Sequence, residues 1–223
     1  MPPPHRPRRG GAPRRRPRPP GRVRIIAGRY RGRFLDVLPV GGLRPTTDRM
    51  RVQLFSWLDP HLPGARVLDL CAGTGALGCE ALSRGAVRAL FVERTPALAE
   101  SLGKRLAEFS APAEVVTGDA RRHLDAVPGP FTLVFLDPPF EDEPLRRELF
   151  AGVLARDLVA RGGFLVLESP RGEAWPEHPA AGWTLHRRAV HARAELRLYR
   201  REDGEGSTGH AEPRGGGSAE RLG

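Results

Sequence analysis

A glycine-rich turn within residues 67–78 constrains the fold of this chain more than any other feature of its sequence. The segment reads Val-Leu-Asp-Leu-Cys-Ala-Gly-Thr-Gly-Ala-Leu-Gly, an apolar run followed by a turn and the start of a helix. Gly73, Gly75 and Gly78 have the GxGxxG spacing, in which the glycines allow a tight turn and a close approach of the backbone to a ligand. This pattern predicts an α/β fold, although a plain strand–helix connection can carry the same glycines.

The following residues alternate between two hydrophobic periods, which extends the α/β prediction to a whole domain. Apolar runs such as Leu-Val-Phe-Leu at 133–136 suit strands that are buried on both faces of a parallel sheet. We expect strands at 66–70, 89–93, 114–117, 133–137 and 164–168, alternating with helices near 76–84, 96–109, 119–126 and 143–160. The runs at 183–189 and 195–200 predict an antiparallel hairpin that completes the sheet.

A small extension is predicted before this series. Residues 23–27 and 33–38 read as two strands around a turn at 28–32, and Asp48 is placed to N-cap a helix that ends near Leu58. The predicted architecture is therefore a Rossmann-like three-layer α/β sandwich. Its mostly parallel seven-stranded sheet has a C-terminal antiparallel hairpin and a small N-terminal β-hairpin extension.

Positive charge is concentrated at the start of the chain. The net charge is +10, and residues 1–51 hold 15 arginines against only two acids, Asp36 and Asp48. Such clustering attracts polyanions, although a solvated tail or an arginine-rich genome would look the same. We expect residues 1–21, rich in Arg and Pro, and residues 202–223 to be disordered. One folded domain then covers 22–201, with a basic hairpin at 22–43 and a site-facing segment and helix at 44–58.

Several classes of protein and site are not expected. No run approaches the 18 uncharged apolar residues of a membrane span, and the N-terminus has no apolar signal core. Cys71 and Cys79 form no CxxC pair, which suggests a reduced, cytoplasmic chain. The histidines lack metal-ligand spacing, and His186 and His191 are expected at the surface, so no metal is predicted. No obligate interface is indicated, and we expect a monomer.

The residues around the glycine turn distinguish two cofactors. Glu93 ends the next strand 24 residues after Asp69, which also satisfies the dinucleotide fingerprint, so NAD has to be considered. Asp69 would repel a pyrophosphate but would attract the ammonium group of a methionine moiety. The cofactor predicted to contact Asp69, Gly73, Gly75 and Glu93 is therefore S-adenosylmethionine (SAM). Asp119 and Ala120 follow the third strand, where an adenine would be read, although Asp119 could merely cap a helix.

The tetrapeptide Asp137-Pro138-Pro139-Phe140 follows the fourth predicted strand and is expected beside the glycine turn. The Asp137 carboxylate and the Pro138 carbonyl can accept both hydrogens of a base amine and free its lone pair for methyl transfer. The two prolines stiffen the loop, and Phe140 offers a stacking face for an extruded base. Orientation and hydrogen bonding would thus carry catalysis, although Asp-Pro-Pro alone is also a common turn.

With these motifs in place, residues 22–201 resemble the bacterial 16S ribosomal RNA guanine-N2 methyltransferases, a class I SAM-dependent family. The resemblance rests on the blocks at 24–33, 43–49, 69–85 and 137–140. The block Leu-Arg-Pro-Thr-Thr-Asp-Arg at 43–49 is the most specific of these. One departure is Val52, where family members usually carry Glu, and the long basic tail is another.

The resemblance implies methylation of one guanine amine in 16S rRNA, within the small ribosomal subunit or its assembly intermediate. It also implies that Arg44 and Thr46 contact the cofactor, while the RNA is bound by Arg29, Arg31, Arg33, Arg49 and Arg51. Two alternatives stay open. The chain could methylate amines of DNA or of another RNA, because the tetrapeptide tolerates several bases. Less in keeping with the intact motifs, it could be a non-catalytic assembly factor that binds RNA through its arginines.

Overall fold

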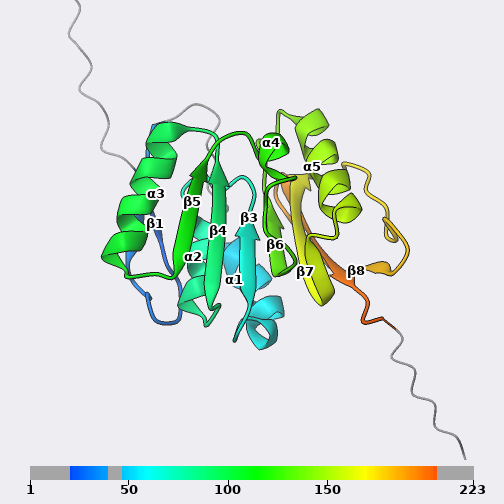
Figure 1. The fold of residues 1–223 in the computed structure, drawn as a ribbon, viewed down its shortest axis with the longest axis horizontal. Coiled ribbons are helices and arrows are strands. Elements are labelled where there is room, and N and C mark those ends of the chain that lie inside the picture. The colour runs from blue at the N-terminus through cyan, green and yellow to red at the C-terminus, as the bar shows by residue number, and fades with distance from the viewer. Residues whose placement is uncertain (1–20, 40–46, 205–223) are drawn as a thin grey trace, which may run out of the picture.

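The computed structural model describes residues 21–39 and 47–204, which form a three-layer α/β sandwich (Figure 1). The central sheet has seven strands in the order β5-β4-β3-β6-β7-β9-β8, and β9 is antiparallel to both of its neighbours. The other neighbouring pairs are parallel. The strands are β3 (Arg66–Asp69), β4 (Arg88–Glu93), β5 (Ala113–Thr117), β6 (Phe131–Leu136), β7 (Val159–Pro170), β8 (Trp183–His191) and β9 (Ala194–Arg201).

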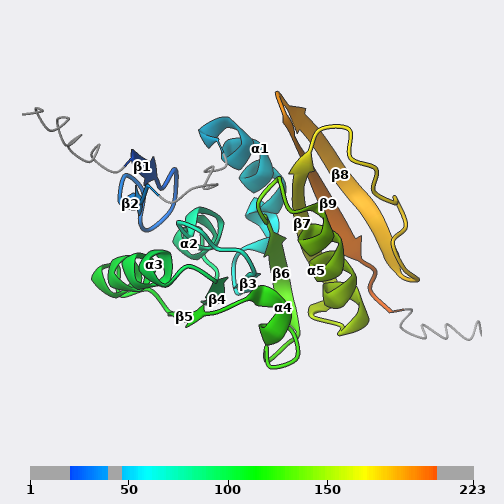
Figure 2. The same cartoon turned by 90° about the horizontal axis from the view of Figure 1, so that it is seen from above.

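Helices cover both faces of the sheet because successive strand residues are apolar. In β3, Val67 packs into the core beneath one layer of helices, and its neighbour Leu68 packs into the core beneath the other. Figure 2 shows the two layers. One contains α1 (Asp48–Leu58), α2 (Ala76–Ser83) and α3 (Pro96–Glu108), and the other contains α4 (Ala120–His123) and α5 (Glu143–Ala155).

The predicted fold class is confirmed, and the differences are local. Thr47, not Asp48, caps α1, because the Thr47 hydroxyl accepts from the Met50 amide at 3.3 Å. Helix α5 ends at Ala155, short of the expected residue 160, because the chain reverses through Asp157 at a φ of 52° and enters β7. Helix α4 is reduced to four residues. No helix in the described part of the chain is long and apolar enough to cross a membrane.

The N-terminal hairpin forms a separate two-stranded sheet of β1 (Gly21–Arg24) and β2 (Phe34–Val37), shorter than predicted. It is docked on α2 through the buried Glu80, whose carboxylate accepts from the amides of Ile26 at 2.7 Å and Ala27 at 3.0 Å. At Gly28, with a φ of 78°, a Cβ would overlap the backbone carbonyl of Ser83, so only glycine allows this contact. The hairpin is therefore fixed to the helix that the glycine turn begins.

The predicted tails fall almost wholly outside the described residues. Of these tails, only residues 21 and 202–204 are described, and Gly21 belongs to β1 while the Glu202 amide donates to the Gly182 carbonyl at 2.8 Å. These residues therefore extend the folded part slightly beyond the predicted limits of 22 and 201. Disorder of the remaining tail residues stays a prediction.

Candidate active site

A cavity of about 410 Å³ lies at the carboxyl ends of the parallel strands, the edge at which open α/β sheets bind ligands. Its volume is within the range of small-molecule sites. Both predicted motifs contribute to it, the glycine turn after β3 and the tetrapeptide after β6. The predicted residues that line it are Asp69, Gly73, Glu93, Asp119, Ala120, Asp137, Pro138, Pro139 and Phe140.

Backbone amides at the glycine turn donate to the carboxylates of Glu93 and Asp69, which fixes the turn between them. The Glu93 side chain accepts from the Gly73 amide at 2.8 Å and from the Thr95 amide at 2.7 Å, so its position at the end of β4 is fixed. Gly75 does not line the cavity. Its φ is 76°, and a Cβ there would lie 2.4 Å from Leu102 of α3, so the packing of the turn against α3 requires glycine. The ligand contact predicted for Gly75 stays a prediction.

Asp69 is a buried carboxylate in the wall of the cavity. Burial raises its pKa to about 7, and the negative charges of Asp137 and Glu93 add to the rise, while the Gly78 amide that donates to Asp69 at 3.1 Å opposes it. A cationic ligand beside Asp69 would stabilise its charged form, whereas a pyrophosphate would destabilise it. The electrostatics at this point therefore fit SAM better than a dinucleotide.

Asp119 lines the same cavity, but its pKa is lowered, whereas that of Asp69 is raised. The Arg121 guanidinium bonds to Asp119 at 2.6 Å and, with the Arg121 amide, lowers the Asp119 pKa to about 2. Asp119 caps α4, which is the alternative role left open by the sequence. Lining the cavity and capping the helix are compatible, and the adenine contact stays a prediction.

The predicted RNA-binding arginines fall into two groups. Arg29, Arg31, Arg33 and Arg49 are exposed, and the first three lie on the hairpin between β1 and β2. The structure contradicts the RNA contact predicted for Arg51, because its side chain is completely buried.

Arg51 instead has three partners inside the protein: the Asp48 carboxylate at 2.7 Å, the Arg24 carbonyl at 2.8 Å and the Glu80 carboxylate at 3.7 Å. Val52, the position at which the family resemblance predicted a glutamate, is half exposed. Arg51 has its two acidic partners, Asp48 and Glu80, without a glutamate there. The predicted cofactor contacts Arg44 and Thr46 lie outside the described residues.

Other lining residues were not expected from the sequence. Glu168, which lies near the end of β7, could have been found by applying the strand-end rule to every parallel strand. His191 was expected at the surface but lines the cavity, and its buried Nε2 has no hydrogen-bond partner among the described residues. Only the antiparallel pairing of β8 with β9 brings His191 to this edge, so no local sequence signal predicts it. Further unexpected lining residues include Thr47, Met50, Cys71, Arg94 and Arg193.

Comparison with known proteins agrees with this arrangement. A family model described as Conserved hypothetical protein 95 matches residues 23–200. Ribosomal RNA small subunit methyltransferase D of Escherichia coli K12 is 42% identical over 183 residues, which are 82% of this chain and 91% of that protein. The chain belongs to the methyltransferase D family. The solved structure of yhhF from Escherichia coli has 41% identity and a TM-score of 0.73, and covers 82% of this chain and 99% of its own.

Membership of the methyltransferase D family confirms the predicted class I methyltransferase fold and SAM as the cofactor. The O-methyltransferase TomG of Streptomyces achromogenes, solved in complex with SAM, shares the fold at 21% identity and a TM-score of 0.55, over 71% of this chain and 82% of its own. Within residues 21–39 and 47–204, no group of three His, Cys, Asp or Glu side chains could hold a metal ion.

Proposed function

We propose that the protein methylates the exocyclic N2 amine of one guanine in 16S rRNA, within the small ribosomal subunit or its assembly intermediate. It would act as a monomer in the cytoplasm. The observation that carries this proposal is that Asp137–Phe140 and the Asp69–Gly73 turn line one cavity in a methyltransferase D family chain. The relatives' name refers to small-subunit ribosomal RNA, and the tetrapeptide supports an amine as the acceptor.

One half of the cavity, the cofactor half, is lined by Asp69, Gly73, Glu93, Asp119 and Ala120. It binds SAM through complementary charge and the shape of its backbone. Asp69 faces the ammonium end of SAM, Glu93 accepts from the ribose hydroxyls, and Asp119 with Ala120 borders the adenine. When bound, SAM supplies an electrophilic methyl group on a sulfonium. The buried Asp69 carboxylate gains a cationic partner on binding, which lowers its pKa again and contributes to affinity.

The other half, the acceptor half, is lined by Asp137–Phe140 and orients the guanine amine that receives the methyl group. The amine of guanine is a poor nucleophile because its lone pair is delocalised into the ring. The Asp137 carboxylate and the Pro138 carbonyl accept its two hydrogens and draw the nitrogen out of conjugation, while Phe140 stacks on the base. The nitrogen becomes cationic as it gains its fourth bond, and the Asp137 carboxylate stabilises that charge. Neutrality returns when one of the two amine protons leaves, either to Asp137 or to water. Arg29, Arg31, Arg33 and Arg49 bind the flanking phosphates.

The test measures methyl transfer from labelled SAM to small subunits of a strain that lacks this activity. Naked 16S rRNA and duplex DNA serve as parallel substrates. We expect one methyl group per small subunit, mapped by mass spectrometry to the N2 of a single guanine. Transfer to DNA alone would favour a DNA amino-methyltransferase, and binding to small subunits without any transfer would favour an assembly factor.

A further inference from the structure

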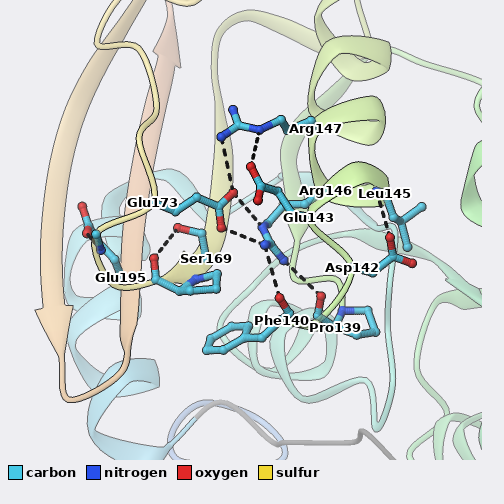
Figure 3. A network of polar contacts seen from close by, with 12 residues as sticks. Pro139, Phe140, Asp142, Glu143, Leu145, Arg146, Arg147, Ser169, Glu173 and Glu195 are labelled. Atoms are coloured by element: carbon cyan, nitrogen blue, oxygen red, sulfur yellow. Dashed lines mark hydrogen bonds and ion pairs between the residues drawn. The ribbon is translucent and has the colours of Figure 1, made fainter.

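Arg146 is a buried cation that lies behind the Asp137–Phe140 loop (Figure 3). It belongs to α5, and its side chain is only 1% exposed. Nη1 donates to the Pro139 carbonyl at 3.0 Å and Nη2 to the Phe140 carbonyl at 3.4 Å. Nε and Nη2 also bond to the Glu173 carboxylate at 3.2 and 2.7 Å. One guanidinium therefore joins the predicted catalytic loop to the connection between β7 and β8.

The loop needs such a partner because of its own sequence. Pro138 and Pro139 have no amide hydrogen, so neither residue can be held through a backbone donor. Two donors meet at the Pro139 carbonyl, the Arg146 guanidinium and the Asp142 amide, the latter at 3.1 Å. Asp142 in turn caps α5 by accepting from the Leu145 amide at 3.0 Å. The end of the loop is thereby fixed to the first turn of α5.

Glu173, which is itself held by Arg197, offsets the cost of burying the charge of Arg146. Its carboxylate neutralises the guanidinium, and its backbone carbonyl accepts from Arg197 of β9 at 2.9 Å. Arg197 also donates to the Ser169 hydroxyl at 2.8 Å and pairs with the buried Glu195 at 2.6 Å. The connection that carries Glu173 is thus tied to side chains of the sheet strands β7 and β9.

We propose that Arg146 is a positioning residue for methyl transfer, which fixes the peptide planes that follow Pro139 and Phe140 and thereby the course of the loop that carries the Asp137 carboxylate and the Phe140 ring. The inference rests on the proposed function of that loop. Arg146 is not among the residues that line the cavity, so it acts through the loop and not on the substrate. Its loss is expected to slow turnover without weakening the binding of SAM or RNA.

The neighbouring Arg147 provides a matched control. It is also on α5 and lies 3.9 Å from the Glu173 carboxylate, but its side chain is 46% exposed. It pairs with Glu143 at 2.8 Å, lies over the Trp175 ring and donates to the Ala174 carbonyl at 3.3 Å, which is outside the tetrapeptide. Removing its charge disturbs the same helix and the same acid while leaving the loop contacts in place.

The experiment compares Arg146→Met, Arg147→Met and the double variant Arg146→Met/Glu173→Met, with small subunits and labelled SAM as substrates. We expect kcat to fall about 10- to 100-fold in both variants that lack Arg146, with KM values within about threefold of wild type. Arg147→Met should keep wild-type kcat. The double variant leaves no unpaired buried charge, so its thermal stability should recover, but its kcat should stay low. Recovery of kcat together with stability would overturn the inference, as would wild-type turnover in folded Arg146→Met.

A second measurement does not depend on the substrate. Amide hydrogen exchange of the peptide 140–145 should be at least about tenfold faster in Arg146→Met and in the double variant than in Arg147→Met. Equal exchange in all of these variants would also overturn the inference. A wild-type protein that methylates no guanine amine would instead refute the proposed function, while the exchange result would still decide whether Arg146 holds the loop.

Discussion

The two halves of the cavity are held in place by different means. In the cofactor half, backbone amides of Gly73, Thr95 and Gly78 bond to the carboxylates of Glu93 and Asp69. In the acceptor half, the prolines remove amides, and a buried ion network centred on Arg146 and Glu173 holds the loop from behind. The comparison shows that one cavity can combine a site built from main chain with a site built from long side chains, and the two should respond differently to mutation.

The sharpest test of this division is Asp137→Asn. Asn accepts only through its neutral amide oxygen and cannot stabilise positive charge on the nitrogen, so we expect kcat to fall about 10³-fold. SAM affinity, measured by calorimetry, should stay within about twofold, because Asp137 belongs to the acceptor half. A large loss of SAM affinity would show that the halves are not separable.

Asp69→Asn is the reciprocal change in the cofactor half. Asn can still accept from the Gly78 amide but carries no charge, and we expect SAM affinity to fall about 10- to 100-fold. Asp119→Asn is the comparator, since the charge of Asp119 is already balanced by Arg121. Its effect should be less than about tenfold. A larger loss for Asp119→Asn than for Asp69→Asn would reverse the assignment of the cation-binding carboxylate.

The raised pKa of Asp69 also predicts a pH dependence. Below pH 7 the protein without SAM holds a proton on Asp69, which has to leave before a cation can pair with it. SAM affinity should therefore fall about tenfold for each pH unit below 7. It should level off above 7 and fall again only where the α-amino group of SAM loses its own proton, at about pH 8. In Asp69→Asn the dependence below pH 7 should disappear. Titrations by calorimetry between pH 5.5 and 8.5 measure both, and a flat wild-type profile would contradict the raised pKa.

The proton on Asp69 also makes the free energy of unfolding depend on pH. The unfolded chain releases it near the ordinary value of 3.8, whereas the native state keeps it up to about 7. The native state therefore binds more protons in this window, and the contribution of Asp69 to the free energy of unfolding falls as pH rises from about 4 to 7. Thermal unfolding without SAM should show a smaller fall in Asp69→Asn than in wild type.

The smallest effects are expected at the hairpin, outside both halves. Arg29→Gln/Arg31→Gln should raise the KM for small subunits about three- to tenfold, with kcat and SAM affinity unchanged. The salt slope of RNA binding should decrease by about 0.7 to 0.9 for each lost phosphate contact. The control is Arg88→Gln/Arg161→Gln, which removes two exposed arginines near the amino ends of β4 and β7. An equal change in that control would indicate a general charge effect instead of docking.

The division between the halves also explains what could be predicted from the sequence. The succession of strands and helices along the chain and the glycine turn follow from local patterns, because apolar runs, glycines and strand-end acids are neighbours in the chain. The network behind the tetrapeptide does not, because Arg146 and Glu173 are 27 residues apart and nothing local marks them as partners. Arg51 illustrates the same limit: in the sequence it is one more arginine of a basic region, and only the packing of α1 against Glu80 buries it.

Glu80 gives the hairpin a fixed place in the molecule. Both of its carboxylate oxygens are bound to the backbone at Ile26 and Ala27, so the hairpin cannot slide along the helix that starts at the glycine turn. An RNA held by the hairpin would then present to the cavity only the nucleotide that lies at one set contour length from the bound phosphates. Under the proposed function, this fixed joint would select one guanine by its distance along the RNA from the bound phosphates.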